Sequence, residues 1–196
     1  MDDRTNKMEG PISNLMHKIE NTLARAAAIT VLSKLKASGM LPMFREGLSS
    51  QSYAVQGASL SAIAMQQPAE AFKSAKRFEA DNKAALTKAL VSIYINNGNS
   101  AEWPVVSKGY KESLRIRDKL ATLAKLTDMI GRLDNAAYAR EGIVLLKDLA
   151  IRYKSYNLQG RFSEAITTVK AKRAELKDDT SVKLADEALK EIADAK

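Results

Sequence analysis

Few side chains in this sequence could do chemistry, and none stands at a catalytic spacing. The single histidine, His17, lies in Met16-His17-Lys18-Ile19, and cysteine is absent. A catalytic zinc site takes about three protein ligands from histidine, cysteine and carboxylate side chains. One histidine without cysteine therefore argues against a zinc site within this chain, and we interpret His17 as a surface helix residue.

Nucleophile and phosphate motifs are also missing. Ser33 and Lys36 match SxxK by letter, but the SDN and KTG partners of that motif do not occur. No serine stands in GxSxG, and neither GxxxxGK[ST] nor GxGxxG is present. The sequence therefore predicts no catalytic, cofactor-binding or metal-binding residue in this chain, which by itself is not expected to be an enzyme.

The acidic pairs fit structural roles better than catalytic ones. Asp178-Asp179 lacks the spaced oxygens and central glycine of a calcium loop, so we expect it to cap the last helix. Glu187 and Glu191 are one helical turn apart and are expected to face water. Paired carboxylates catalyse when they flank a cleft, and nothing in the sequence places a cleft there.

The aromatic residues leave two interpretations open. Trp103, between Glu102 and Pro104, is either a packing anchor at a helix junction or an exposed contact for a partner domain. The six tyrosines are spread along the chain. They either bury their rings and keep their hydroxyls wet or line a concave face.

The elements that must position these residues are helical. Apolar residues recur at intervals of three and four, and no segment alternates as a strand does. Ser49 or Ser50 is expected to cap the third helix, and Asn99 or Ser100 the short one. The predicted helices cover 12–35, 43–48, 55–63, 68–78, 85–93, a short segment around Trp103, 116–133, 143–153, 162–176 and 184–192.

Short connections between helices predict antiparallel pairs. Residues 52–60 align loosely with 81–90, an offset of about thirty residues that indicates a repeat, and small residues in both places favour close helix packing. A single hairpin cannot bury its apolar face alone, so such pairs must stack. The predicted fold is all-α: a HEAT-like or armadillo-like α-α superhelix of about nine or ten helices. We expect one repeat domain over residues 1–196, with a subdivision near 98–111.

Charge and hydropathy limit the kinds of partner that this chain could bind. The net charge is +8, but residues 1–50, 51–100, 101–150 and 151–196 each contribute +2, as on an ordinary solvated surface. The sequence contains no linear basic arm of the kind that would favour nucleic-acid binding. Charges are scattered through the first thirty residues, which excludes a signal-peptide core, and no stretch of about 18 apolar residues could span a bilayer. We expect no membrane contact and a location in the cytoplasm, or export with a larger parent protein.

Several segments resemble known helical repeats. Gln51 to Ala58, QSYAVQGA, resembles the second helix of a HEAT-like repeat, with Gln56 standing where many such repeats have arginine. The order of features further resembles the C-terminal helical domain of aminopeptidase N-like zinc metallopeptidases, the gluzincin family. The segments that carry this resemblance are Asp2 to Thr5, Asn21 to Leu35 with Arg25 followed by alanines, Ser52 to Val55, and Gly142 to Lys154.

The resemblance implies a helical domain that lacks the catalytic residues of the family. Peptidases of this family hold one zinc through HExxH and a further glutamate, and none of these residues is present here. On this hypothesis the chain packs on the catalytic domain that precedes it, where the zinc lies, and restricts the access of peptide substrates to the cavity. The alternative hypothesis is a stand-alone HEAT-like scaffold that binds a protein or, as a weaker possibility, a nucleic acid.

Overall fold

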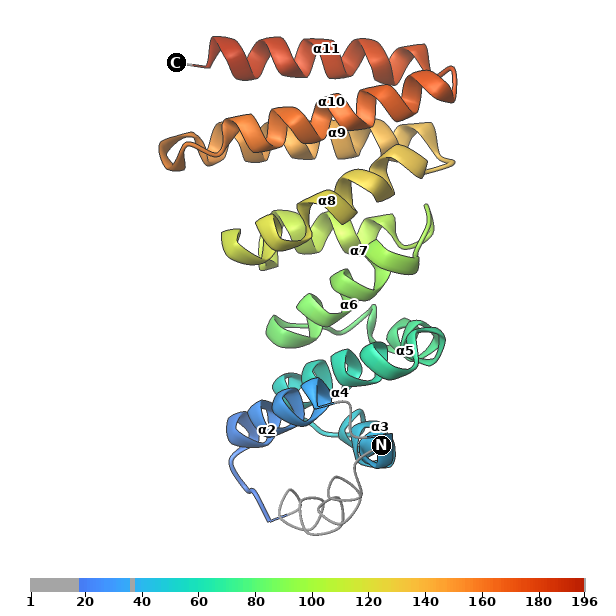
Figure 1. The fold of residues 1–196 in the computed structure, drawn as a ribbon, viewed down its shortest axis with the longest axis vertical. Coiled ribbons are helices and arrows are strands. Elements are labelled where there is room, and N and C mark those ends of the chain that lie inside the picture. Colours follow the sequence, from blue (N-terminus) through green and yellow to red (C-terminus); the bar gives the residue numbers. More distant parts are fainter. Residues whose placement is uncertain (1–17, 36–37, 196) are drawn as a thin grey trace. The chain divides into compact units, whose positions relative to one another are not determined.

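The computed structural model describes residues 18–35 and 38–195, and within these ranges the chain forms helices and loops with no strand (Figure 1). The all-α prediction is confirmed. The α-helices are α2 (Thr22–Lys34), α3 (Leu41–Gly47), α4 (Tyr53–Gln66), α5 (Pro68–Ala75), α6 (Ala84–Asn97), α7 (Trp103–Lys108), α8 (Ile116–Arg132), α9 (Ala136–Arg152), α10 (Gln159–Glu175) and α11 (Asp179–Asp194). Short 3-10 turns cover Ser38–Met40, Lys76–Phe78 and Lys154–Tyr156, and a π-helical turn, η3, covers Gly109–Ser113.

The helices form two compact units, one ending at Ile93 and the other beginning at Tyr94, within α6. The single repeat domain with a subdivision near 98–111 stays a prediction.

The first unit is built around α4. Helices α2, α3 and α5 each pack on α4. Phe44 of α3, Val55 and Ile63 of α4 and Ala71 of α5 are completely buried, so one apolar core serves all of these helices. A buried aliphatic or aromatic side chain contributes roughly 1.5–3 kcal/mol relative to an exposed one, and this burial holds the short helices in place.

The small residues of α4 allow the close packing that the sequence predicts. A Cβ atom on Gly57 would lie 2.5 Å from the backbone carbonyl carbon of Ala85, at the start of α6. Backbone cannot move aside as the end of a long side chain can, so only glycine fits here.

The second unit contains two stacked helical hairpins, α8/α9 and α10/α11. Helix α8 packs on α10, α9 packs on α11, and each hairpin closes on itself. Helices α9, α10 and α11, coloured yellow-orange to red, lie side by side in Figure 1. The arrangement gives two layers, and their shared core includes Ile130, Ile143 and Ile166.

Some helix ends follow local chemistry as predicted. Pro68 is the first residue of α5, where its missing N–H costs little. Asn135, in the predicted break, caps α9 by accepting hydrogen bonds from two backbone N–H groups, and Asp178 caps α11 through the N–H of Ser181.

Other predicted ends are wrong. The helix expected over 12–35 is not continuous: residues 18–21 are not helical, and α2 begins at Thr22, where Asn21 caps it, while residues 12–17 lie outside the described residues. Ser52, rather than Ser49 or Ser50, occupies the N-cap of α4, and its side chain makes no capping bond. The Ser50 hydroxyl instead accepts a hydrogen bond from the Ser52 N–H.

The cap expected for the short helix around Trp103 is also wrong. Glu102, rather than Asn99 or Ser100, is the N-cap residue of α7. Asn99 accepts a hydrogen bond from the N–H of Ala101 within the preceding turn. The Ser100 hydroxyl has a long-range partner, Asp134.

Candidate functional site

A surface groove lies between α8 and α10 in the second unit. Leu123, Thr127 and Ala165 are buried at its base, and the exposed Ala121 and Ala124 stand on its α8 side. Its volume is about 430 Å³. Alanine and threonine at successive helical positions leave this space open, because longer side chains there would fill it. The groove extends over about two helical turns, or roughly 10 Å.

The groove ends where α10 reaches across to α8. The ammonium group of Lys172 binds the carboxylate of Asp128, and the Lys172 stem passes next to Gly131. A hydrogen bond from Lys172 lowers the pKa of Asp128. Charge on the α10 side comes from Arg161 and Glu164, which line the groove and form no ion pair with any residue that the structure describes.

The hydroxyls in the groove are already satisfied. Thr127 donates to the carbonyl of Leu123 at 2.8 Å, and Thr168 donates to the carbonyl of Glu164 at 3.0 Å. A nucleophile needs an adjacent base, and neither hydroxyl is paired with one. The groove can therefore accommodate a side chain or a short segment of another molecule, but its own residues supply no nucleophile.

A half-buried carboxylate joins α7 to α9. Glu141 accepts hydrogen bonds from the indole N–H of Trp103 at 3.0 Å, the Ser107 hydroxyl at 3.1 Å and the Lys111 ammonium at 2.9 Å. The donors are four residues apart along α7 and η3, so they share one face. Burial opposes ionisation of Glu141, but these hydrogen bonds outweigh it and lower its pKa. Glu141 therefore joins α7 and η3 to α9, and we call a polar side chain that joins helices in this way a strut.

Lys119 on α8 is almost fully buried, with 2% of its surface exposed. Its ammonium lies 3.4 Å from the hydroxyl of Tyr153 and 5.6 Å from the centre of the same ring. Burial lowers the pKa of Lys119, and the nearby charge of Arg152 lowers it further. The aromatic face thus replaces a counter-ion at the α8/α9 contact.

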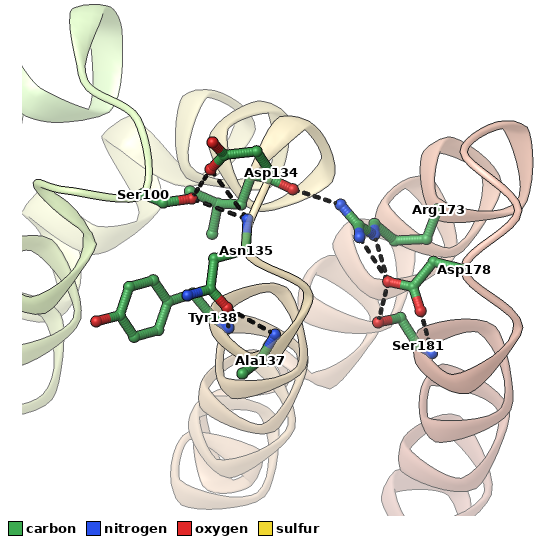
Figure 2. A network of polar contacts seen from close by, with 9 residues as sticks. Ser100, Asp134, Asn135, Ala137, Tyr138, Arg173, Asp178 and Ser181 are labelled. Atoms are coloured by element: carbon green, nitrogen blue, oxygen red, sulfur yellow. Dashed lines mark hydrogen bonds and ion pairs between the residues drawn. The ribbon is translucent and has the colours of Figure 1, made fainter.

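The turns at one end of the second unit are joined by hydrogen bonds (Figure 2). The Ser100 hydroxyl, after α6, donates to the Asp134 carboxylate, after α8, and accepts from the N–H of Asn135 at 3.1 Å. The Asn135 side chain then accepts from the N–H groups of Ala137 and Tyr138 at 2.9 and 3.3 Å. One turn is thereby fixed to the next, 34 residues further along the chain.

The chain of contacts continues to the last hairpin (Figure 2). Arg173 on α10 donates to the carbonyl of Leu133, at the end of α8, at 2.6 Å. Its other nitrogens hold the Asp178 carboxylate at 2.9 and 2.5 Å, and Asp178 accepts from both the N–H and the hydroxyl of Ser181. Arg173 is 4% exposed.

A similar contact occurs two helices earlier in the chain. Arg132, at the end of α8, donates to the carbonyls of Gly98 at 2.7 Å and Ile95 at 3.3 Å, which terminate α6. A cation at a helix C-terminus satisfies unpaired carbonyls and the helix dipole. Arg132 and Arg173 therefore have equivalent roles at the C-terminal ends of α6 and α8.

The residues singled out in the sequence do not converge. His17 and Lys36 lie outside the described residues, and the Ser33 hydroxyl donates to the carbonyl of Thr30. Glu191 pairs with Lys147 of α9 at 2.6 Å. Among the described residues, no three histidine, cysteine or carboxylate side chains group as metal ligands.

The aromatic residues are mostly structural. Trp103 is completely buried, so the packing interpretation holds and the exposed-contact interpretation is wrong. Tyr94 and Tyr110 are also completely buried, whereas Tyr156 is 67% exposed. No helix in the described part of the chain is long and apolar enough to cross a bilayer.

Over the residues that the structure describes, the fold is all-α, and its second unit contains stacked hairpins, polar contacts that join helices, and a surface groove. Neither a family model, nor a curated protein, nor a solved structure matches this chain.

Proposed function

We propose that this chain is a non-catalytic helical module that packs on a larger protein. The observation that carries the proposal is the role of three ionic groups that are buried or half-buried. Glu141, Lys119 and Arg173, which burial and neighbouring charges could have tuned for chemistry, each join one helix to another. Side chains committed to such contacts stabilise architecture, and a rigid helical surface is what a binding module requires.

The groove between α8 and α10 is the surface that we assign to the partner. Its small residues admit side chains of another polypeptide, and Arg161 and Glu164 leave both signs of charge available at the side. Ligand sites in helical proteins commonly lie between neighbouring helices.

The partner that we propose is the catalytic domain of an aminopeptidase N-like zinc peptidase. This assignment rests on the resemblance of segments such as Asn21 to Leu35 to the helical domain of that family. In that setting the module would restrict entry of peptides to the zinc-containing cavity. The open groove supports equally the alternative, a stand-alone scaffold that binds a protein.

Two measurements on the purified chain test the non-catalytic role. Metal analysis should find no stoichiometric zinc, and aminoacyl p-nitroanilides should not be hydrolysed with zinc supplied. Hydrolysis that a chelator abolishes would overturn the proposal.

A third measurement tests the assigned surface. Ala124→Arg should weaken binding of the peptidase domain that this proposal names as the partner, expressed separately, because a long side chain fills the groove. Glu187→Arg, on the exposed face of α11, is the matched control and should bind as the unaltered chain does. Equal binding by both variants would remove the groove from the proposal.

A further inference from the structure

Helix α2 has an apolar side that no described residue covers. It packs on α4 through a face that buries Ile29 and Leu32. On the opposite face, Leu23 is 71% exposed and Val31 is 58% exposed, and Leu35, directly after the helix, is 64% exposed. Leu23, Ala27 and Val31 are four residues apart, so they form one stripe along the helix. Apolar stripes of this kind mark interaction surfaces.

The stripe is self-complementary about Ala27. In an antiparallel pair of α2 helices centred on Ala27, Leu23 of one copy lies opposite Val31 of the other, and Ala24 lies opposite Thr30. The alanine at the centre permits close approach of the two backbones. The Thr30 hydroxyl already donates to the carbonyl of Ala26 at 2.9 Å, so burying it leaves no donor unsatisfied.

The charges at the two ends of the stripe have the same symmetry. Glu20 precedes the helix and Lys34 ends it, both are exposed, and neither forms an ion pair with a described residue. Antiparallel pairing brings Glu20 of each copy to the Lys34 end of the other. It also aligns the helix dipoles in opposite directions.

We propose that two copies of this chain associate through α2, antiparallel and with Ala27 on the two-fold axis. A two-fold interface uses the same patch on both copies, which is what self-complementarity about one residue provides. Stable interfaces bury about 1,200–2,000 Å² in total, and a single helix pair covers less. The dimer is therefore weak and dissociates on dilution. This inference concerns the first unit and does not depend on the proposed function.

The mass of the 196-residue chain in solution tests the proposal. By light scattering or sedimentation equilibrium, the mass should rise from one chain toward two as concentration increases. Val31→Glu should remain a single chain at every concentration, because it places two charges in the apolar stripe. Met65→Glu, at a 55% exposed position on α4, is the matched control and should associate like the unaltered chain. A chain that stays monomeric, or a dimer that Val31→Glu leaves intact, would overturn the proposal.

Cross-linking tests the orientation, since the sequence has no cysteine of its own. Ala27→Cys should form a disulfide-linked dimer on mild oxidation. Leu23→Cys mixed with Val31→Cys should give the mixed dimer, while Leu23→Cys alone should not link to itself. Lys190→Cys, on α11, sets the background level. Self-linking of Leu23→Cys would show a parallel pair, and an Ala27→Cys yield at background would show that α2 does not mediate association; either result contradicts the proposal.

Discussion

Arg173 on α10 holds the carboxylate of Asp178 with two guanidinium nitrogens while a third hydrogen bond reaches the carbonyl of Leu133. Asp178 in turn caps α11. One buried arginine therefore ties the end of α8 to the start of α11. Both side chains are well buried, 4% and 12% exposed, so the pair is shielded from solvent screening.

Removing the arginine should destabilise the second unit strongly. Arg173→Met leaves Asp178 buried without its partner, and breaking a buried pair in this way costs about 3–5 kcal/mol. Urea unfolding followed by Trp103 fluorescence measures the loss, since this is the single tryptophan and it is completely buried.

The matched control is Lys170→Met, which breaks the more exposed pair with Asp186. Such pairs contribute up to about 1 kcal/mol. If the two variants lost equal stability, Arg173 would not be the strut described here.

Acid should weaken the same contact. Burial would raise the pKa of Asp178, but hydrogen bonds from Ser181 and Arg173 outweigh it, and the pKa is lowered. The unfolded chain therefore binds a proton at higher pH than the folded chain. The stabilisation is fully present above the ordinary aspartate pKa of about 3.9 and is lost as pH falls through the lowered folded-state value.

The variant Asp178→Asn checks this sign. Its free energy of unfolding should be lower than that of the unaltered chain at neutral pH, and its decline in acid should be shallower, so that the two curves approach each other. Urea titrations at a series of pH values measure both curves. Parallel curves over the whole range would mean that Asp178 does not contribute to the acid sensitivity.

Two glycines should respond to alanine with opposite signs. In Gly57→Ala the new methyl meets the Ala85 backbone, and such overpacking costs typically about 1–3 kcal/mol. Gly160, in the first turn of α10, has no atom within 4 Å of the added Cβ. Gly160→Ala should therefore stabilise the chain by about 0.5–1 kcal/mol. Thermal unfolding of both variants compares them, and equal shifts would contradict the close α4–α6 contact.

Helix ends were predictable where chemistry is local. Pro68 begins α5, and Asn135 and Asp178 cap their helices by accepting hydrogen bonds within the first turn. Proline, asparagine and aspartate are typical of these positions, so the residue types alone indicate the helix starts. Ser100 does not cap the short helix, as expected of it or Asn99, because its hydroxyl binds Asp134, 34 residues away. Sequence spacing carries no direct record of such a tertiary contact.

The buried charged residues that join helices were less easily recognised in the sequence. Arg173 is four residues after Val169 and seven after Ile166, and Lys119 is four residues before Leu123, so both charges stand on apolar stripes. A charged residue in that position is rarely buried without a partner, which could have identified them. The groove was not predictable, since it depends on which residues of α8 and α10 face each other.

Neutralising the Glu141 carboxylate, which joins α7 to α9, should cost less stability than removing Arg173. Glu141→Gln keeps the shape but removes the charge, and charge-assisted hydrogen bonds are roughly twice as strong as neutral ones. We expect a loss of about 1 kcal/mol. Glu187→Gln, exposed on α11, should change stability by less than about 0.5 kcal/mol. Equal effects in urea unfolding would show that Glu141 is not a strut.

The native polypeptide that contains residues 1–196 tests the central claim most directly. Its mass and its tryptic peptides can be measured by mass spectrometry after enrichment from cells with an antibody to this chain. The account predicts a polypeptide with a mass greater than 21.5 kDa, whose tryptic peptides include some from a preceding domain that contains HExxH. A native polypeptide of 21.5 kDa beginning at Met1 would contradict the peptidase assignment.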